Sequence, residues 1–255
     1  MLFQFEHVNL DHGPGGKWDR RPVNLRDLKT SWNRWQHGLA ERGWNSLYLS
    51  NHDQPRHLSR FGNDDEFRYE SATLWATLLH LQRGTPYVYQ GEEIGMTNAG
   101  FTSIEQYRDV ESLNFYAEST AQGMPAGEAL EALRAMSRDN PRTPMQWTAG
   151  PNAGFTEGQP WIDVNPNHVD VNAEADRSAE KSVFRYYQDL IRLRHTHDVV
   201  VLGDFHLEAP EHPHLFAYRR TLDDAAWLVL ANVSGDVLEV PLGLADDGPL
   251  ILGNY

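Results

Sequence analysis

The chain has 255 residues, 40% of them hydrophobic, so it can bury one large core or two moderate ones and is not disordered by composition. Its formal net charge is −14, with no lysine or arginine cluster to offset it, so neither nucleic acid nor an anionic membrane is expected as a partner. There is no cysteine, and no apolar run comes near the length of about 20 residues that a membrane helix needs. A cytoplasmic protein without disulfides or thiolate metal sites is therefore expected.

The first third of the chain predicts strands alternating with helices. Residues 2–7 favour a strand already under way, so we expect the chain to open in mid-fold. Asn24 is placed to cap a helix that Gly43 would end, and a second amphipathic helix would end at Gly84. Residues 45–50 and 85–89 predict the next two strands. Helices of this length between strands indicate a parallel sheet with right-handed crossovers.

The pattern changes twice after the third strand. Residues 97–180 predict short helices and long loops rich in Asn, Pro and Gly, and such a stretch usually covers a functional site. After a last helix, short alternating runs follow from about residue 199. Residues 216–219, 227–232, 238–240 and the chain end near 250–255 predict antiparallel strands of an incomplete β-sandwich. We therefore expect two domains, 1–198 and 199–255.

Polar residues follow each predicted parallel strand. The pair His52-Asp53 comes directly after the second strand, and Glu6-His7 and residues 90–93 follow the other two. Because parallel strands end on one rim, these side chains are expected near the mouth of a sheet or barrel, where small polar ligands are bound. The alternative is a strand terminus whose polar side chains satisfy loose backbone groups.

Several longer motifs carry a family resemblance. The motifs are Gly43–Tyr48, Asn51–Arg56, Arg60–Asp64, Gly84–Met96 and Arg142–Trp147. With these motifs in this order, the chain resembles the bacterial oligo-1,6-glucosidase and alpha-glucosidase group of the alpha-amylase superfamily, glycoside hydrolase family 13, along its whole length. The resemblance implies an α/β fold: the carboxyl-terminal part of a (β/α)8 barrel, strands 6 to 8, followed by an antiparallel β-sandwich domain.

The resemblance also implies a function. The family releases terminal alpha-linked glucose from short gluco-oligosaccharides with retention, and here an alpha-1,6 linkage is expected. Asp53 matches the carboxylate that stabilises the transition state, and His52 and Arg138 match residues that bind the same glucosyl unit. No cofactor and no metal site is expected within this chain; the structural calcium that relatives often carry lies near the first barrel strand, which is expected upstream of Met1. The nucleophile Asp and acid/base Glu of the family are expected upstream of Met1, so the chain as given is predicted to be inactive alone.

For several other side chains a structural role is weighed against a functional one. Arg138 and Asp139 could form an ion pair that ties down a loop, and Arg142 is expected to be structural. Adjacent Glu92 and Glu93 point in opposite directions on an extended segment, so at most one faces the pocket and support of the rim is favoured. The functional hypotheses for four further residues are weaker. Glu6 and His7 are expected behind the pocket lining, and Trp147 and Trp161 could stack on a sugar.

Two other functions stay open. A trehalose synthase-type glucosyl transferase would share the barrel and the His52-Asp53 pair, although Gln54-Pro55-Arg56 favours a glucosidase. A non-catalytic relative, similar to the heavy chains of amino-acid transporters, would be expected to lose the His-Asp pair. The expected alpha-1,6 preference rests on the resemblance alone, because the residues that the family uses to choose the linkage follow the nucleophile motif, which is expected upstream of Met1.

Overall fold

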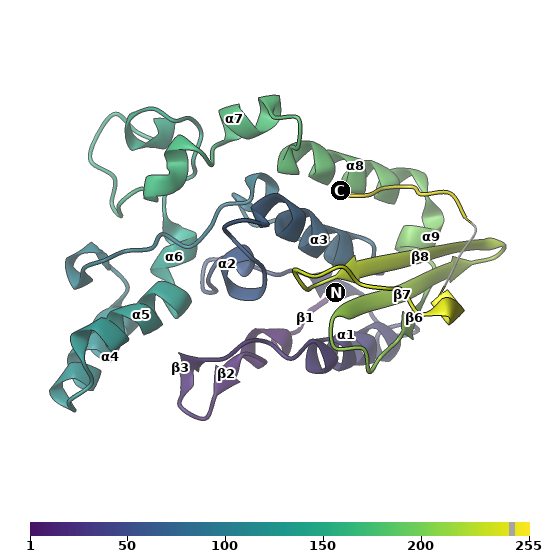
Figure 1. The fold of residues 1–255 in the computed structure, drawn as a ribbon, viewed down its shortest axis with the longest axis horizontal. Coiled ribbons are helices and arrows are strands. Elements are labelled where there is room, and N and C mark those ends of the chain that lie inside the picture. Colours follow the sequence, from purple (N-terminus) through teal and green to yellow (C-terminus); the bar gives the residue numbers. More distant parts are fainter. Residues whose placement is uncertain (245–247) are drawn as a thin grey trace.

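The computed structural model describes residues 1–244 and 248–255 (Figure 1). The strands are β1 Leu2–Phe3, β2 His12–Gly13, β3 Gly16–Arg20, β4 Asn45–Leu47, β5 Thr85–Pro86, β6 Asp204–Glu208, β7 Leu215–Leu222 and β8 Ala225–Asn232. The α-helices are α1 Leu25–Gly38, α2 His57–Phe61, α3 Arg68–His80, α4 Val110–Ala121, α5 Ala126–Met136, α6 Asp139–Arg142, α7 Ala173–Ser178, α8 Val183–Thr196 and α9 Asp198–Val201. Short 3₁₀ turns occupy His7–Asn9, Glu92–Ile94, Ile104–Gln106, Pro151–Gly154, Pro166–Val169 and Leu242–Leu244.

The predicted parallel sheet is present, with shorter strands than expected. Its order is β1-β4-β5, and both pairs are parallel, with Leu2 opposite Asn45 and Leu47 opposite Pro86. Residues 4–7 leave the ladder because the Gln4 amide bonds the His7 ring across 2.7 Å and the chain turns into a 3₁₀ helix. The other two strands are also shorter than predicted, since β4 ends at Leu47 and β5 ends at Pro86.

The helix start predicted at Asn24 is confirmed, and the predicted end is wrong. The Asn24 side chain accepts a hydrogen bond from the Arg26 N–H at 2.9 Å, which caps α1. The helix stops at Gly38 instead of Gly43, and Leu39 closes it by donating to the Trp35 carbonyl at 3.2 Å. Gly43 ends only one further turn, in which its N–H donates to the Leu39 carbonyl at 3.1 Å.

One hydrophobic core runs through both halves of the chain. Trp32 of α1 meets Phe216 of β7 with ring centroids 5.4 Å apart, and Leu78 and Tyr187 are buried in the same cluster. The fully buried Arg220 of β7 donates to the Leu81 and Val200 carbonyls, both at 2.6 Å. The antiparallel sheet therefore packs directly on the helical layer formed by α1, α3, α8 and α9.

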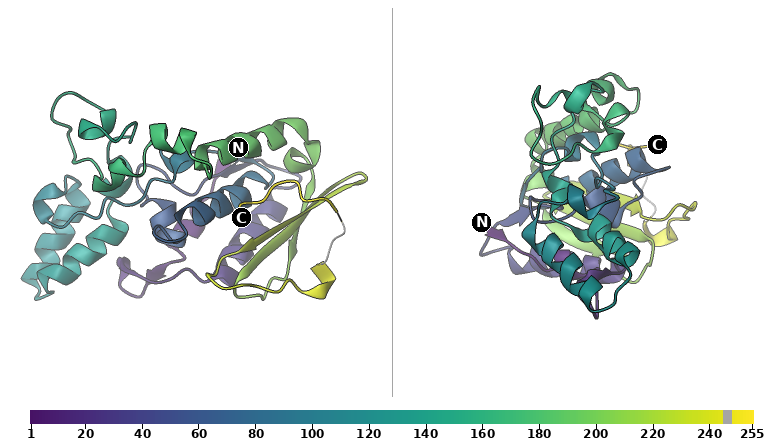
Figure 2. Two further views of the ribbon diagram at one scale, coloured as in Figure 1. Left: turned by 45° about the horizontal axis from the view of Figure 1, so that its top comes forward. Right: turned by 90° about the vertical axis from the view of Figure 1, so that its left-hand side faces the viewer.

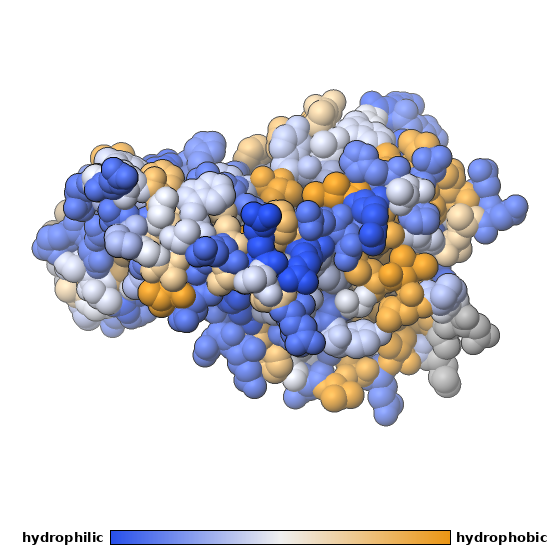
Figure 3. Space-filling view, turned by 90° about the horizontal axis from the view of Figure 1, so that it is seen from above, coloured by the Kyte–Doolittle hydropathy of each residue, from blue (hydrophilic) through white to orange (hydrophobic). Residues whose placement is uncertain are grey.

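The carboxyl-terminal region is one sheet of three strands. Its order is β6-β7-β8, with Phe205 opposite Arg220 and Phe216 opposite Ala231. Within the described residues, 238–240 and 250–255 form no paired strand, so the strands predicted there are absent and a second sheet is not seen. Apolar surface is concentrated at this end of the molecule on the face drawn in Figure 3.

The long segment between β5 and α8 extends away from the sheets. The α4–α5 hairpin lies at the opposite end of the molecule from β6, β7 and β8 (Figure 2). It is tied back by Trp18 of β3, which stacks on Phe115 of α4 with ring centroids 4.4 Å apart. The stretch after α5 then returns over the end of the parallel sheet through α6. No helix among residues 1–244 and 248–255 is long and apolar enough to cross a membrane.

Candidate active site

A tight loop after β4 presents His52 and Asp53. Asn51 builds the turn: its carbonyl accepts from the Gln54 N–H at 3.3 Å, and its side chain accepts from the Asp53 N–H at 2.8 Å. The base of the loop is closed where the Ser50 hydroxyl accepts from the His57 N–H at 3.1 Å. The side chains of His52 and Asp53 remain 72% and 45% exposed. The loop thus holds an imidazole and a carboxylate open to solvent at the end of the sheet, as predicted.

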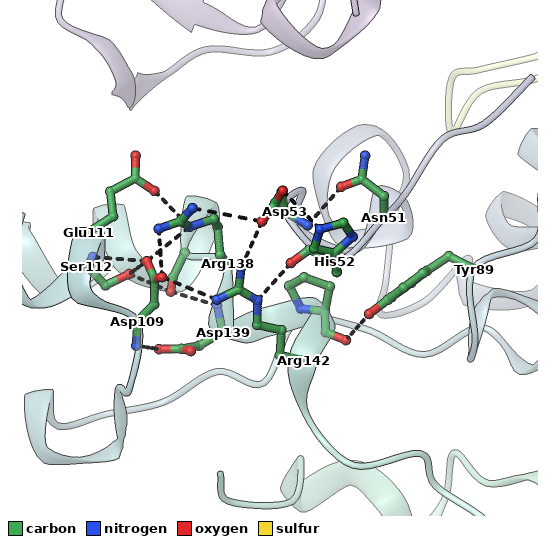
Figure 4. Close-up of polar contacts among 12 residues, drawn as sticks. Asn51, His52, Asp53, Tyr89, Asp109, Glu111, Ser112, Arg138, Asp139 and Arg142 are labelled. Atoms are coloured by element: carbon green, nitrogen blue, oxygen red, sulfur yellow. Dashed lines mark hydrogen bonds and ion pairs between the residues drawn. The ribbon is translucent and has the colours of Figure 1, made fainter. Parts of the chain in front are cut away.

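Asp53 stands between an imidazole and two guanidinium groups (Figure 4). Its Oδ2 lies 3.2 Å from His52 Nε2, and its Oδ1 lies 2.8 Å from Arg142 Nη2. Arg138 Nη1 is farther, 3.9 Å from the same Oδ1. The structure therefore brings together all three residues singled out from the sequence, Asp53, His52 and Arg138.

Arg142 has a closer contact with Asp53 than Arg138 does. The sequence predicts only a structural role for Arg142, so its place in the site is a correction. Besides binding the carboxylate, its Nε donates to the His52 carbonyl at 2.8 Å. The two arginines are four residues apart, which places them on one side of the single turn α6. That spacing was the available signal that both side chains would reach the same place.

Two acidic residues behind the arginines were not recognised from the sequence. Asp109 Oδ1 lies 2.8 Å from Arg138 Nη2 and 3.3 Å from Arg142 Nη1, and Glu111 Oε2 lies 3.2 Å from Arg138 Nε. Burial alone would raise the pKa of Asp109, but the hydrogen bond and charge of Arg138 outweigh it and hold the pKa below its ordinary value. Asp109 is therefore an anionic anchor for both guanidinium groups.

The Asp109 anchor is itself fixed in place. Asp109 caps α4 by accepting from the Ser112 N–H at 3.2 Å, while the buried Asp139 accepts from the backbone N–H groups of Arg108 and Asp109 at 2.8 and 2.9 Å. Asp139 thus bonds backbone, and the ion pair with Arg138 that the sequence suggested is made by Asp109 instead. The α4 start, α6 and the loop after β4 form one connected polar cluster (Figure 4).

The other acidic candidates face away from Asp53. Buried Glu92 lies 3.5 Å from the His57 ring, and Glu93 accepts from the Gly91 N–H at 2.8 Å, so both contact the rim of the sheet. Burial raises the pKa of Glu93. Glu6 accepts from Ser31 and Trp35 of α1 and is turned toward that helix.

The arrangement has the chemistry of a sugar-binding site. A half-exposed carboxylate, an imidazole and two guanidinium groups provide directional acceptors and donors for hydroxyl groups and for developing positive charge. Retaining glycosidases place two carboxyl groups about 5–5.5 Å apart across the scissile bond. Here the neighbouring carboxylates of Asp109 and Glu111 are occupied by arginines. In the described part of the chain, no three His, Asp or Glu side chains gather as metal ligands would.

Comparison with known proteins gives consistent matches. Residues 1–203 match the family model described as the alpha-amylase catalytic domain. The oligo-1,6-glucosidase of Halalkalibacterium halodurans is 51% identical, over 100% of this chain and 46% of its own length. The crystal structure of Bacillus licheniformis trehalose-6-phosphate hydrolase superposes with a TM-score of 0.95 at 41% identity, over 100% of this chain and 47% of that one. A trehalulose synthase structure is 36% identical, with a TM-score of 0.87, over 92% of this chain and 42% of that one. The chain spans about half the length of the curated relatives it matches.

Proposed function

This chain belongs to the alpha-amylase family, and on that premise we propose that it is part of a retaining, exo-acting alpha-glucosidase. The enzyme would remove terminal glucose from short alpha-linked gluco-oligosaccharides, preferring alpha-1,6 linkages. The observation that carries the proposal is the half-exposed Asp53 carboxylate, held between His52 and Arg142 at the end of the parallel sheet.

Each residue of this cluster has a distinct role in the proposal. Asp53 binds hydroxyl groups of the reacting glucose and stabilises the positive charge that develops as the glycosidic bond breaks, which is an interaction stronger in the transition state than in the ground state. His52 donates to the same glucose. Arg142 orients the Asp53 carboxylate, and Arg138 binds substrate while anchored on Asp109 and Glu111.

The architecture is proposed on the same premise. Residues 1–198 would supply strands 6 to 8 of a (β/α)8 barrel, and residues 199–255 would begin a carboxyl-terminal β-sandwich domain. The order β1-β4-β5 with parallel pairing supports the first part. From the family resemblance we place the nucleophile and the acid/base outside these 255 residues, and we infer that the chain is inactive alone; that Asp109 and Glu111, the acidic residues of the cluster beside Asp53, are held by arginines is consistent with this. A cytoplasmic enzyme that does not bind nucleic acid is proposed from the composition.

The test compares two proteins. The full-length protein, with these residues in their natural chain, and the 255-residue chain alone are assayed for glucose release from isomaltose, maltose and sucrose. We expect release by the full-length protein, with the alpha anomer appearing first by NMR, and none by the 255-residue chain. Asp53→Asn should abolish turnover, and Asp170→Asn, an exposed acid, should not. A folded full-length protein without turnover on any glucoside would overturn the proposal.

Glucosyl transfer is the second candidate, because the fold superposes closely on a trehalulose synthase. The same assay separates the two, since a transferase converts sucrose or maltose into an isomeric disaccharide and a glucosidase gives free glucose. A non-catalytic role like that of the transporter heavy chains would leave every substrate unchanged. The exposed His52 and Asp53 side chains argue against that role, because such a relative is expected to lose the pair.

A further inference from the structure

Arg56 is a buried cation three residues after Asp53. It is 1% exposed, and its guanidinium reaches away from its own loop. Nη1 donates to the Gln90 carbonyl, and Nη2 donates to the Pro141 carbonyl at 3.2 Å. Its backbone N–H donates to the Asn98 side chain at 3.0 Å. Both ends of this residue are therefore bound to segments distant in the sequence.

The two carbonyl partners of Arg56 belong to the other walls of the candidate site. Gln90 follows β5, and Pro141 directly precedes Arg142. The Pro141 carbonyl also accepts from the Tyr89 hydroxyl at 3.1 Å (Figure 4), and the Arg56 guanidinium lies 5.2 Å from the centre of the Tyr89 ring. One guanidinium thus links the segment that carries Asp53 to the segment that carries Arg142.

Burying the charged Arg56 guanidinium costs free energy, because the charge loses its hydration. Within residues 1–244 and 248–255, no carboxylate lies within ion-pair distance of its guanidinium, and Nε has no hydrogen-bond partner. Burial lowers the pKa of Arg56, with Tyr89, Glu92 and Glu93 opposing the shift. An apolar residue here would leave the Gln90 and Pro141 carbonyls without this donor, so the arginine is accounted for by these two bonds and not by packing alone.

We propose that Arg56 is a positioning residue that sets the contact between Asp53 and Arg142 by holding the Gln90 and Pro141 carbonyls. The proposal deepens the glucosidase function and rests on it for the activity measurement only. The Arg56 guanidinium donates to the two carbonyls from two different nitrogens held in one rigid plane, whereas a lysine at this position would offer one donor nitrogen on a flexible stem. A displacement of about 1 Å at a reacting site lowers the rate by on the order of 100-fold.

The test uses Arg56→Lys and Arg56→Met in the full-length protein. Crystal structures are expected to show the 2.8 Å contact between Arg142 Nη2 and Asp53 Oδ1 lengthened beyond hydrogen-bonding distance. On isomaltose, kcat is expected to fall by on the order of 100-fold with a much smaller change in KM. In an Arg142→Ala background, Arg56→Lys should add less than tenfold, because the contact it positions is already absent.

Arg220→Lys is the matched control. Arg220 is equally buried and also bonds backbone carbonyls, those of Leu81, Val200 and Gly203, at the junction with the antiparallel sheet. It should lose stability without the loss in kcat. Equal kcat losses in the two lysine variants at matched stability, or an unchanged 2.8 Å contact in Arg56→Lys, would overturn the proposal. If Arg56→Met does not fold, Arg56→Lys decides. If the wild-type protein hydrolyses no glucoside, the proposed function fails and the contact distance still decides the role of Arg56.

Discussion

Arg142 and Asp53 lie 89 positions apart in the sequence, and Arg142 Nη2 and Asp53 Oδ1 are 2.8 Å apart in space. The same guanidinium donates through Nε to the His52 carbonyl at 2.8 Å. Arg142 therefore holds both the His52 backbone carbonyl and the Asp53 carboxylate in place. The planar fork of arginine suits these two acceptors, because Nε and Nη2 donate to them from fixed positions in one plane.

The first prediction concerns the two arginines of α6. In the full-length protein, Arg142→Lys is expected to lower kcat by about 100-fold, because one preorganised interaction at the charged centre is lost. Arg138→Lys is expected to cost about fivefold, as for a screened ion pair of about 1 kcal/mol, since its nearest atom is 3.9 Å from Asp53. Steady-state kinetics on isomaltose measure both. A loss for Arg138→Lys as large as that for Arg142→Lys would contradict this ranking of the two arginines.

The second prediction concerns the turn after β5. Gly91 has φ +91°, and a Cβ there would lie 2.4 Å from Met96 Sδ and 3.0 Å from Arg56 Nη1. Gly91→Ala is expected to destabilise the protein by well over the cost of about 1–2 kcal/mol for a left-handed alanine. Gly100→Ala is the control, because Gly100 has φ +65° with no atom within 4 Å of the added carbon. Denaturant unfolding of both variants should separate steric overlap from backbone strain, and equal losses would contradict the contact.

The third prediction concerns pH. Burial lowers the pKa of His7 from 6.5 to about 3 and that of His80 to about 4. Below pH 6.5 these two histidines become protonated in the unfolded chain but stay neutral in the folded one. Protonation therefore stabilises the unfolded state, and the free energy of unfolding falls as the pH falls toward 4. Each histidine contributes a slope of about 1.4 kcal/mol per pH unit in this window.

The measurement is denaturant unfolding at pH 7, 6, 5 and 4. His80→Gln keeps a donor for the Ala76 carbonyl and should remove about one histidine's share of the slope. His206→Gln, at an exposed position of β6, serves as the control and should leave the slope as in the wild type. An undiminished slope in His80→Gln would show that this histidine does not couple folding to pH.

The fourth prediction concerns Lys29 of α1. Its buried amino group donates to the carbonyls of Ala209, His212 and Leu215 at 2.9, 2.8 and 3.2 Å, which ties α1 to the loop between β6 and β7. Lys29→Met should cost at least about 1–3 kcal/mol of unfolding free energy, because it leaves buried carbonyls without a donor.

Lys181→Met provides the comparison for Lys29→Met. Lys181 is 57% exposed and pairs with Glu70 at 2.8 Å, so its loss should cost much less stability than the loss of Lys29, because solvent screens an exposed ion pair. Thermal unfolding of the two variants measures the difference. If the two variants lose similar amounts of stability, the three carbonyls must form hydrogen bonds with water when the amino group is removed.

Local sequence was sufficient for features that depend on neighbouring residues. Asn24 as a helix cap, the apolar face of α1, and the strand positions near Asn45 and Thr85 follow from short-range bonds and periodicity, so they could be predicted. Strand lengths could not, because a ladder continues only where a partner is aligned, and Gln4 with His7 ends β1 early. The strand expected at 238–240 likewise has no described partner.

The sequence by itself therefore determined the family, the His52-Asp53 pair and the parallel unit that places it, since these reside in contiguous motifs. Only the tertiary structure decided that Arg142 is nearer to Asp53 than Arg138 is, that Asp109 anchors both, and that Arg56 joins their segments. Such contacts depend on how long side chains from separate loops meet when the loops pack together. The four-residue spacing of Arg138 and Arg142 indicates that both reach one place, but it does not show which acceptor each guanidinium binds, because the packed loops select among several acceptors.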